Sequence, residues 1–132
     1  MMRWLVPVAM ACCVMQAEAA ITVEQLQQQQ AVTQGALLQY NLAKDEQRSL
    51  IERAESQWTL WQLYSQLAVL YYAGGDYDRG GYYQVVAVTA QTEYDRLMGL
   101  LRPMEAAVEA RGQTYLRELA RLQAMLGAYH KQ

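Results

Sequence analysis

Apolar residues recur at helical spacing along most of the chain, and they are densest between Trp58 and Tyr72. Two adjacent rows share this segment: Leu60, Leu63, Leu67 and Leu70 form one row, and Trp61, Tyr64, Ala68 and Tyr71 form the other. Together they leave only a narrow polar edge, so we expect this helix to be covered on more than one side.

The second half of the chain carries a pattern typical of a coiled coil. Apolar residues follow one another at intervals of four and three: Tyr83, Ala87, Ala90, Tyr94, Leu97 and Leu101, and later Val108, Gly112, Tyr115, Leu119, Leu122, Leu126 and Tyr129. Such spacing places the residues on one face of a helix. No segment alternates apolar and polar residues as a strand would, so the pattern predicts an all-α fold.

Three local signals suggest where helices begin or break. Thr22 and Gln25 have the spacing of a capping box at a helix start. Ser49 and Glu52 repeat that spacing within a charged stretch, which makes a break near residues 44–48 plausible. Pro103 would press its ring against the carbonyl of Gly99, so a helix there would kink or start afresh.

Two architectures are compatible with these signals. One is an antiparallel bundle of three or four helices, broken near residues 44–48 and at Pro103; the other is a long two-helix coiled-coil hairpin. The wide apolar face of residues 60–72 favours the bundle, or else a hairpin that forms a homo-oligomer, because one partner helix cannot cover it.

The first residues have the layout of a secretory signal peptide. Arg3 is followed by an apolar run from Trp4 to Met15, and small residues surround a cleavage point after Ala19. The run is too short to span a bilayer. We therefore expect residues 1–19 to be a signal peptide, residues 20–132 to form a single helical domain, and the protein to be exported to the bacterial periplasm or otherwise secreted. Retention of the segment as an anchor, or lipidation of Cys12, are the alternatives.

Composition excludes several classes of site. Both cysteines, Cys12 and Cys13, lie in this leader, so the exported protein would have neither disulfides nor a thiolate nucleophile. The formal net charge is −2 with signs scattered along the chain, which does not favour a nucleic-acid partner. After cleavage of the leader no membrane span is expected.

Residues 76–81 are the nearest thing to a metal loop. Asp76 and Asp78 match the first and third positions of a calcium loop, but Ala87 occupies the twelfth, where a carboxylate is needed. We expect Asp76 to cap the following helix instead. The one histidine, His130, lies near the C-terminus, and the remaining carboxylates fit solvated helix faces. The sequence thus predicts no metal, no cofactor and no enzymatic activity.

The segment YSQLAVLYYAGGDY, residues 64–77, resembles the first helix and turn of a tetratricopeptide repeat. The match is carried by residues at the helix contacts and the turn: Tyr64, Leu67, Ala68, Tyr71, Gly75, Asp76 and Tyr77. The resemblance implies a helix–turn–helix corner and binding of a peptide or protein on a helical face rather than catalysis.

Aromatic residues supply the candidate binding site. The chain has ten tyrosines and no phenylalanine, and such rings are common anchors in protein interfaces. We expect a protein-binding adaptor or assembly factor of the cell envelope, such as an accessory part of a secretion or conjugation apparatus. The candidate contact residues are Trp58, Trp61, Tyr71, Tyr72, Tyr77, Tyr82 and Tyr83. The alternative is a holdase-like chaperone or small apolar ligand carrier that uses residues 60–72.

Overall fold

A computed structural model describes residues 20–132, and the predicted signal peptide lies outside the described residues. Two helices account for nearly all of this part of the chain: α2 runs from Val23 to Ala73 and α3 from Tyr77 to His130. No strand is found in residues 20–132. The prediction of an all-α fold is therefore confirmed.

The prediction of three or four helices is wrong for the described residues. α2 continues without interruption through residues 44–48, and α3 continues through Pro103. Within residues 44–48 there is neither proline nor glycine, and Asp45 and Arg48 form an ion pair one turn apart (3.6 Å), so nothing there ends the helix. A capping-box spacing inside a helix is thus not enough to start a new one.

The predicted start of α2 is confirmed in detail. The backbone N–H of Gln25 donates to Oγ1 of Thr22 at 3.2 Å, and the N–H of Thr22 donates to Oε1 of Gln25 at 3.0 Å. These reciprocal bonds satisfy two amides that a helix terminus leaves without partners.

A tight turn joins the two helices at residues 74–76. The N–H of Asp76 donates to the carbonyl of Tyr71 (2.9 Å), and the N–H of Gly75 donates to that of Tyr72 (3.1 Å). This is the hydrogen-bond pattern of a Schellman motif, which needs a left-handed residue, and Gly75 has φ of 83°. Asp76 then caps α3 by accepting a bond from the N–H of Arg79 at 3.1 Å, as the sequence predicts.

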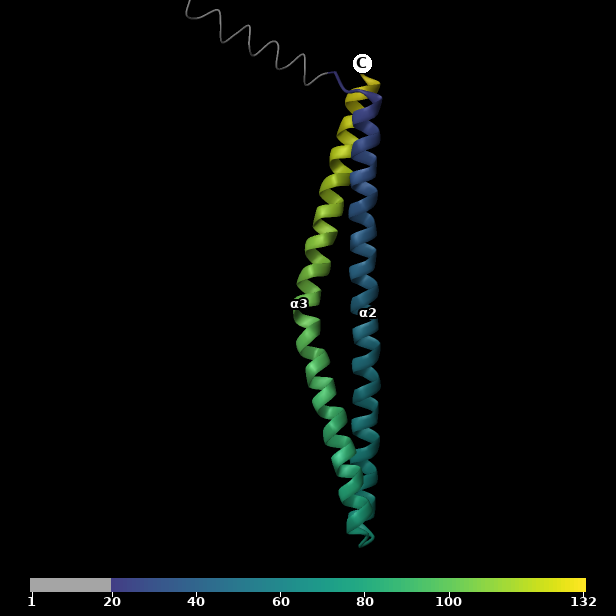
Figure 1. Ribbon diagram of the computed structural model, residues 1–132, viewed down its shortest axis with the longest axis vertical. Helices are drawn as coiled ribbons and strands as arrows, with labels where there is room; N and C mark the ends of the chain where they lie inside the picture. The colour runs from purple at the N-terminus through teal and green to yellow at the C-terminus, as the bar shows by residue number, and fades with distance from the viewer. Residues whose placement is uncertain (1–19) are drawn as a thin grey trace, which may run out of the picture. The chain divides into compact units, whose positions relative to one another are not determined.

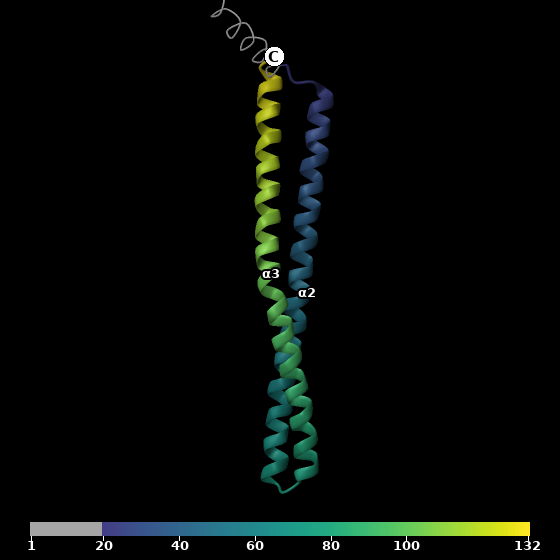
Figure 2. The same cartoon turned by 60° about the vertical axis from the view of Figure 1, so that its left-hand side comes forward.

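The described residues divide into two compact units, each an antiparallel pair of helical segments. Unit 1 comprises residues 20–40 and 111–132, and unit 2 comprises residues 41–110. In unit 2, the segments on either side of the turn lie side by side in both views (Figures 1 and 2). Within residues 20–132, no helix has a stretch apolar enough to cross a membrane.

The contact between the helices of unit 2, which we call the seam, is built from small residues and rings. Its buried residues are Ala43, Ala54, Ala68, Gly80, Ala87, Ala90, Leu97 and Leu101. Because alanine and glycine leave little side chain between two helices, the backbones can approach closely. The predicted row from Tyr83 to Leu101 lies in this seam, buried or half-buried throughout.

Unit 1 has a polar layer at its helix contact. Gln29 and Thr33 are buried, and Nε2 of Gln29 donates to the Glu118 carboxylate at 2.7 Å and to its backbone carbonyl at 3.2 Å. Oγ1 of Thr33 donates to the carbonyl of Gln29 at 2.8 Å, and Arg121 lies 3.7 Å from Glu118. These partners compensate for taking an amide and a hydroxyl out of water.

Candidate protein-binding surface

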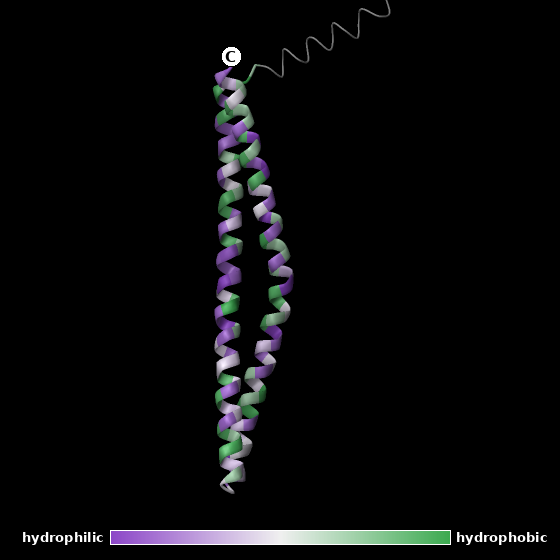
Figure 3. Ribbon diagram, turned by 180° about the vertical axis from the view of Figure 1, so that it is seen from behind, coloured by the Kyte–Doolittle hydropathy of each residue, from purple (hydrophilic) through white to green (hydrophobic). Residues whose placement is uncertain are grey.

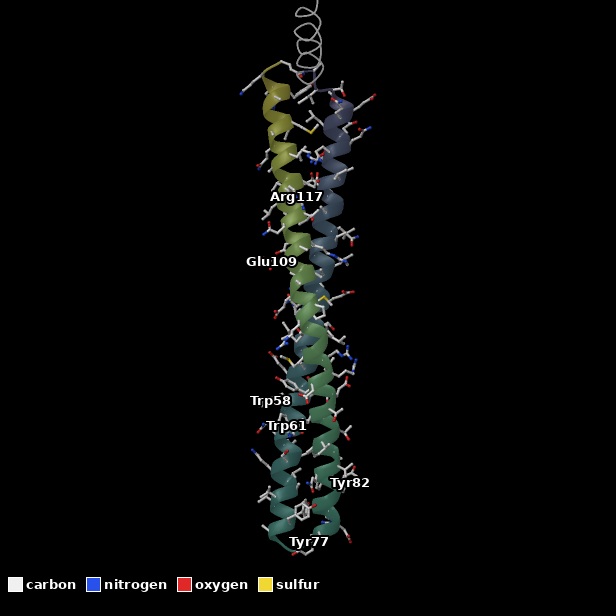
Figure 4. The ribbon with its side chains drawn as sticks, turned by 90° about the vertical axis from the view of Figure 1, so that its left-hand side faces the viewer. Trp58, Trp61, Tyr77, Tyr82, Glu109 and Arg117 are labelled. Carbon is white, nitrogen blue, oxygen red and sulfur yellow. The ribbon has the colours of Figure 1, made fainter. Side chains whose placement is uncertain are left out.

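The seven candidate contact residues all lie in unit 2, but they divide into two groups. Trp61, Tyr71 and Tyr83 are half-buried in the seam, whereas Trp58, Tyr72, Tyr77 and Tyr82 are exposed. Figure 4 shows Trp58 and Trp61 on α2, Tyr82 on α3 and Tyr77 at the end with the turn. The exposed residues are accessible to a partner, whereas the half-buried residues pack between the two helices.

An aromatic stack joins the helices near the turn. The ring of Tyr83 lies between those of Tyr64 and Tyr71, with centroid distances of 5.7 and 5.3 Å and nearly parallel planes. The guanidinium of Arg79 lies 5.7 Å from the Tyr71 ring, within the range of a cation–π contact. These contacts pack α2 against α3 next to the turn, in the region that also carries the exposed rings of Tyr72, Tyr77 and Tyr82.

A second aromatic cluster lies further from the turn. The Trp58 and Trp61 rings meet edge to face at 4.9 Å, and Tyr94 of α3 lies 5.3 Å from Trp58 and 6.5 Å from Trp61. Trp58 remains 43% exposed despite both contacts. It is therefore a large ring that packs on two aromatic neighbours and is still accessible to a partner, and tryptophan is one of the residues most often found as an interface anchor.

Trp58 borders an open groove of about 660 Å³ in unit 2. We call it the Trp58 groove; its lining residues are Ile51, Ala54, Glu55, Trp58, Thr59, Tyr94, Met98, Leu101 and Glu105. Ile51 and Met98 are exposed to a similar degree as Trp58. The lining contains two carboxylates and no basic residue. The groove therefore offers apolar contacts together with two negative charges.

The other side of the seam is marked by an ion pair. Nη2 of Arg53 on α2 lies 3.9 Å from the Glu93 carboxylate on α3. Residues seven apart share a side of a coiled-coil helix. Leu60 and Leu67 follow Arg53 at that interval, and Val86 and Arg79 precede Glu93 at the same interval. These residues therefore continue along the same side toward the turn.

Leucines dominate this second side. We call the following set the leucine face: Leu60, Leu63, Leu67 and Leu70 of α2 with Tyr82 and Val86 of α3. Leu63 is 49% exposed, and Leu70 and Tyr82 are each more than 60% exposed. Hydrophobic positions recur on both helices in this part of unit 2 (Figure 3). Of the two rows that the sequence shows in residues 58–72, the row of Trp61 enters the seam and the row of leucines faces outward.

Glu93 is the one described carboxylate whose pKa is clearly displaced. A hydrogen bond from Arg96, at 2.8 Å from its Nε, lowers the pKa of Glu93 below the ordinary value of 4.5, and the charges of Arg96 and Arg53 lower it further. Partial desolvation acts in the opposite direction. A lowered pKa keeps Glu93 ionised, which suits an ion pair and not a general acid.

The described residues hold no cluster of three or more metal-ligating side chains. Asp76 is engaged in capping α3 and lies 3.5 Å from Arg79, its ion-pair partner. His130 is exposed beside the ring of Tyr129. Neither Asp76 nor His130 therefore belongs to a metal-ligating cluster in residues 20–132.

Of the residues that line the Trp58 groove, sequence reasoning named only Trp58 as a candidate contact. It missed Ile51, Tyr94 and Met98, and it assigned the carboxylates of Glu55 and Glu105 to solvated helix faces. Tyr94 was assigned to the seam, where one side of its ring does lie, but its approach to both tryptophans depends on the pairing of the two helices. Ile51 lies seven residues before Trp58, and Met98 lies seven before Glu105. This interval was the available signal, since it places each pair on one side of its helix.

Comparisons with known proteins give no relatives: no family model matches the chain, and neither the curated proteins nor the solved structures contain a match. The resemblance of residues 64–77 to a tetratricopeptide repeat therefore stays a prediction.

Proposed function

We propose that this chain is an exported, non-enzymatic protein of the bacterial cell envelope that binds another protein through the Trp58 groove. It would act as an adaptor or assembly factor, for example in a secretion or conjugation apparatus. The observation that supports this role is an open, largely apolar groove whose lining includes two carboxylates and a tryptophan that packs on Trp61 and Tyr94 and is 43% exposed.

The chemistry of the groove indicates the kind of partner. An amphipathic helix binds a groove of this type with apolar side chains one turn apart. Ile51, Trp58 and Met98 would receive these anchors. Glu55 and Glu105 would attract lysine or arginine beside them, and this attraction adds specificity and speeds association more than it adds affinity.

A direct test uses a synthetic amphipathic helix with leucine anchors and flanking lysines, titrated against the full-length protein while tryptophan fluorescence is recorded. Trp58→Ala should weaken binding about tenfold or more, because truncation of a central anchor costs about 2 kcal/mol. Glu55→Gln with Glu105→Gln should weaken binding several-fold at low salt and reduce its salt dependence. The matched control, Val85→Ala, changes a residue that is exposed and lies outside the groove. Equal affinity of wild type and Trp58→Ala would exclude this binding mode.

A test in cells addresses the native partner. A photo-crosslinking amino acid at position 98 should trap one envelope protein, and the same group at position 85 should not trap it. In the same experiment, the mass of this chain, purified from the cells, should correspond to a protein that begins at Ala20. A mass that includes residues 1–19 would contradict cleavage of the predicted signal peptide.

The second candidate function, a holdase-like chaperone or carrier of small apolar ligands, draws support from the exposed leucine face. This function predicts that the protein suppresses aggregation of an unfolded client and binds a hydrophobic dye at that face. Leu63→Glu with Leu70→Glu should abolish both effects. Wild-type protein that shows neither effect would remove this candidate.

A further inference from the structure

The leucine face is apolar and free of charge over its whole length, and all of its residues except the half-buried Leu67 and Val86 are exposed. No Asp, Glu, Lys or Arg occurs in residues 57–75, which comprise the end of α2 and the first residues of the turn, or in residues 80–92 of α3. Several of its side chains are about half exposed or more. Contiguous apolar surface of this kind usually marks an interface.

Charged residues occur at the two ends of this surface, and their arrangement is symmetric. Arg79, Val86 and Glu93 lie at seven-residue intervals on α3, so they follow one side of the helix. The positive charge lies one heptad before Val86 and the negative charge lies one heptad after it. The side chains of Arg79 and Glu93 are 69% and 34% exposed, so both can contact a second molecule.

We propose that the leucine face is an interface between two copies of this chain. A two-fold axis crosses both helices at the level of Val86, so that α3 packs antiparallel on the partner's α3 and α2 on the partner's α2. Arg79 of each copy then meets Glu93 of the other, and the leucine rows of the two copies interdigitate. The product in this region is a four-helix arrangement of two hairpins.

The size of the surface is sufficient for such a dimer. Residues 57–73 of one helix extend about 25 Å at about 1.5 Å per residue, and two helices of about 10 Å each give a width of about 20 Å. The resulting footprint is roughly 500 Å². Because side chains roughen the surface, its accessible area approaches the roughly 800 Å² per partner that stable interfaces bury.

Charge favours a second copy over other occupants, and the antiparallel orientation over the parallel one. An isologous interface must complement itself, and a neutral centre with opposite charges at equal distances from the axis does so. In a parallel arrangement both turns would meet and each α3 would face the partner's α2, so Arg79 would lie opposite the uncharged residues 57–75. Arg79 would then have no acidic partner across the interface, whereas the antiparallel orientation supplies Glu93.

The decisive experiment mixes two charge-reversed variants and measures association by sedimentation at low salt. Arg79→Glu alone places two like-charge contacts in the homodimer, and so does Glu93→Lys. We expect each to weaken dimerisation several-fold. In an equimolar mixture both contacts of the heterodimer have opposite charges, so the mixture should associate several-fold more tightly than either variant alone. A mixture no tighter than its components would overturn the proposed orientation.

Further variants test the leucine face itself. Leu63→Glu with Leu70→Glu should give a folded monomer by sedimentation and circular dichroism, and Val85→Glu, equally exposed but off the face, should remain dimeric. As a check that does not depend on these variants folding, Val86→Cys in a Cys12→Ser, Cys13→Ser background should form an interchain disulfide on oxidation, and Val85→Cys should not. Wild-type protein that is monomeric at all concentrations would overturn the proposal.

This inference does not depend on the Trp58 groove. Trp58→Ala should remain dimeric, and the variant Leu63→Glu with Leu70→Glu should still bind the amphipathic peptide. Failure of one proposal is therefore distinguishable from failure of the other.

Discussion

The ring of Tyr72 lies directly against the backbone of Gly80, across the turn that joins α2 to α3. A Cβ on Gly80 would come within 2.9 Å of Cδ1 of that ring, closer than real Cβ contacts. The hydroxyl of Tyr72 also bonds to the Gln84 side chain at 2.8 Å, which holds the ring in this position. Gly80 thus permits the Tyr72 side chain of α2 to pack against the backbone of α3 near the turn.

We predict that Gly80→Ala destabilises the protein by about 1–3 kcal/mol, because the methyl group overpacks the contact with Tyr72. The matched control is Gly99→Ala in the same helix, where nothing lies within 4 Å of the added Cβ. That substitution should stabilise the helix by up to about 1 kcal/mol. Urea denaturation of both variants measures the difference, and equal effects would contradict the close packing at Tyr72.

Sequence predicts the helical content, the start of α2, the cap of α3 and the α3 side of the seam in unit 2, because each depends on residues close together in the chain. The number of helices was not predictable from Ser49 and Glu52, since the same spacing occurs inside helices. A continuous pattern was the better signal. Buried and half-buried positions of α2 follow at intervals of three and four without a break: Leu26, Gln29, Thr33, Ala36, Tyr40, Ala43, Gln47, Leu50, Ala54, Gln57, Trp61, Tyr64, Ala68 and Tyr71.

The same continuity explains why the row of leucines lies outside. Counting back from Leu60 by sevens reaches Arg53, whereas counting back from Trp61 by sevens reaches Ala54, which is buried. Local hydrophobicity alone favours burying the leucines, but a whole helix must present one side to its partner. The candidate site was predictable in residue type and region, and the division between seam and exposed rings required the pairing of the helices.

The polar layer of unit 1 gives a second prediction. Gln29→Leu should destabilise the protein by about 1–3 kcal/mol, because it removes a donor from the Glu118 carboxylate, whose side chain is only 17% exposed. Combining it with Glu118→Leu should recover much of this loss, since two apolar residues can then pack together. A double-mutant cycle by chemical denaturation gives the coupling. Additive effects would contradict the contact.

Tyr94 gives a third prediction, because its ring contacts both Trp58 and Trp61. Tyr94→Ala should destabilise the protein by about 2 kcal/mol and shift tryptophan emission to the red, since the ring's burial and its aromatic contacts are lost and water reaches the indoles. Tyr94→Phe keeps the ring and serves as the control, with little change expected in either measurement. An unchanged emission maximum in Tyr94→Ala would show that Tyr94 does not shield the tryptophans.

Glu93 makes stability depend on pH in a direction that follows from its lowered pKa. The unfolded carboxyl titrates near its ordinary value of 4.5, and hydrogen bonding to Arg96 lowers the pKa in the folded protein. Near pH 4.5 the unfolded state therefore binds more protons, so stability falls as the pH falls. The contribution of Glu93 is complete above the unfolded pKa and is lost as the pH drops through the folded one.

Glu93→Gln removes this titration while keeping the size of the side chain. The difference in free energy of unfolding between wild type and Glu93→Gln should be largest near neutral pH and should shrink as the pH is lowered through about 4.5 and below. Added salt should reduce it, because the pair is exposed to solvent. Arg96→Gln should reproduce the effect by removing the other partner. Urea denaturation of wild type and variants across this pH range measures the difference in free energy of unfolding. A difference that stays constant with pH would show that the ion pair does not contribute to stability.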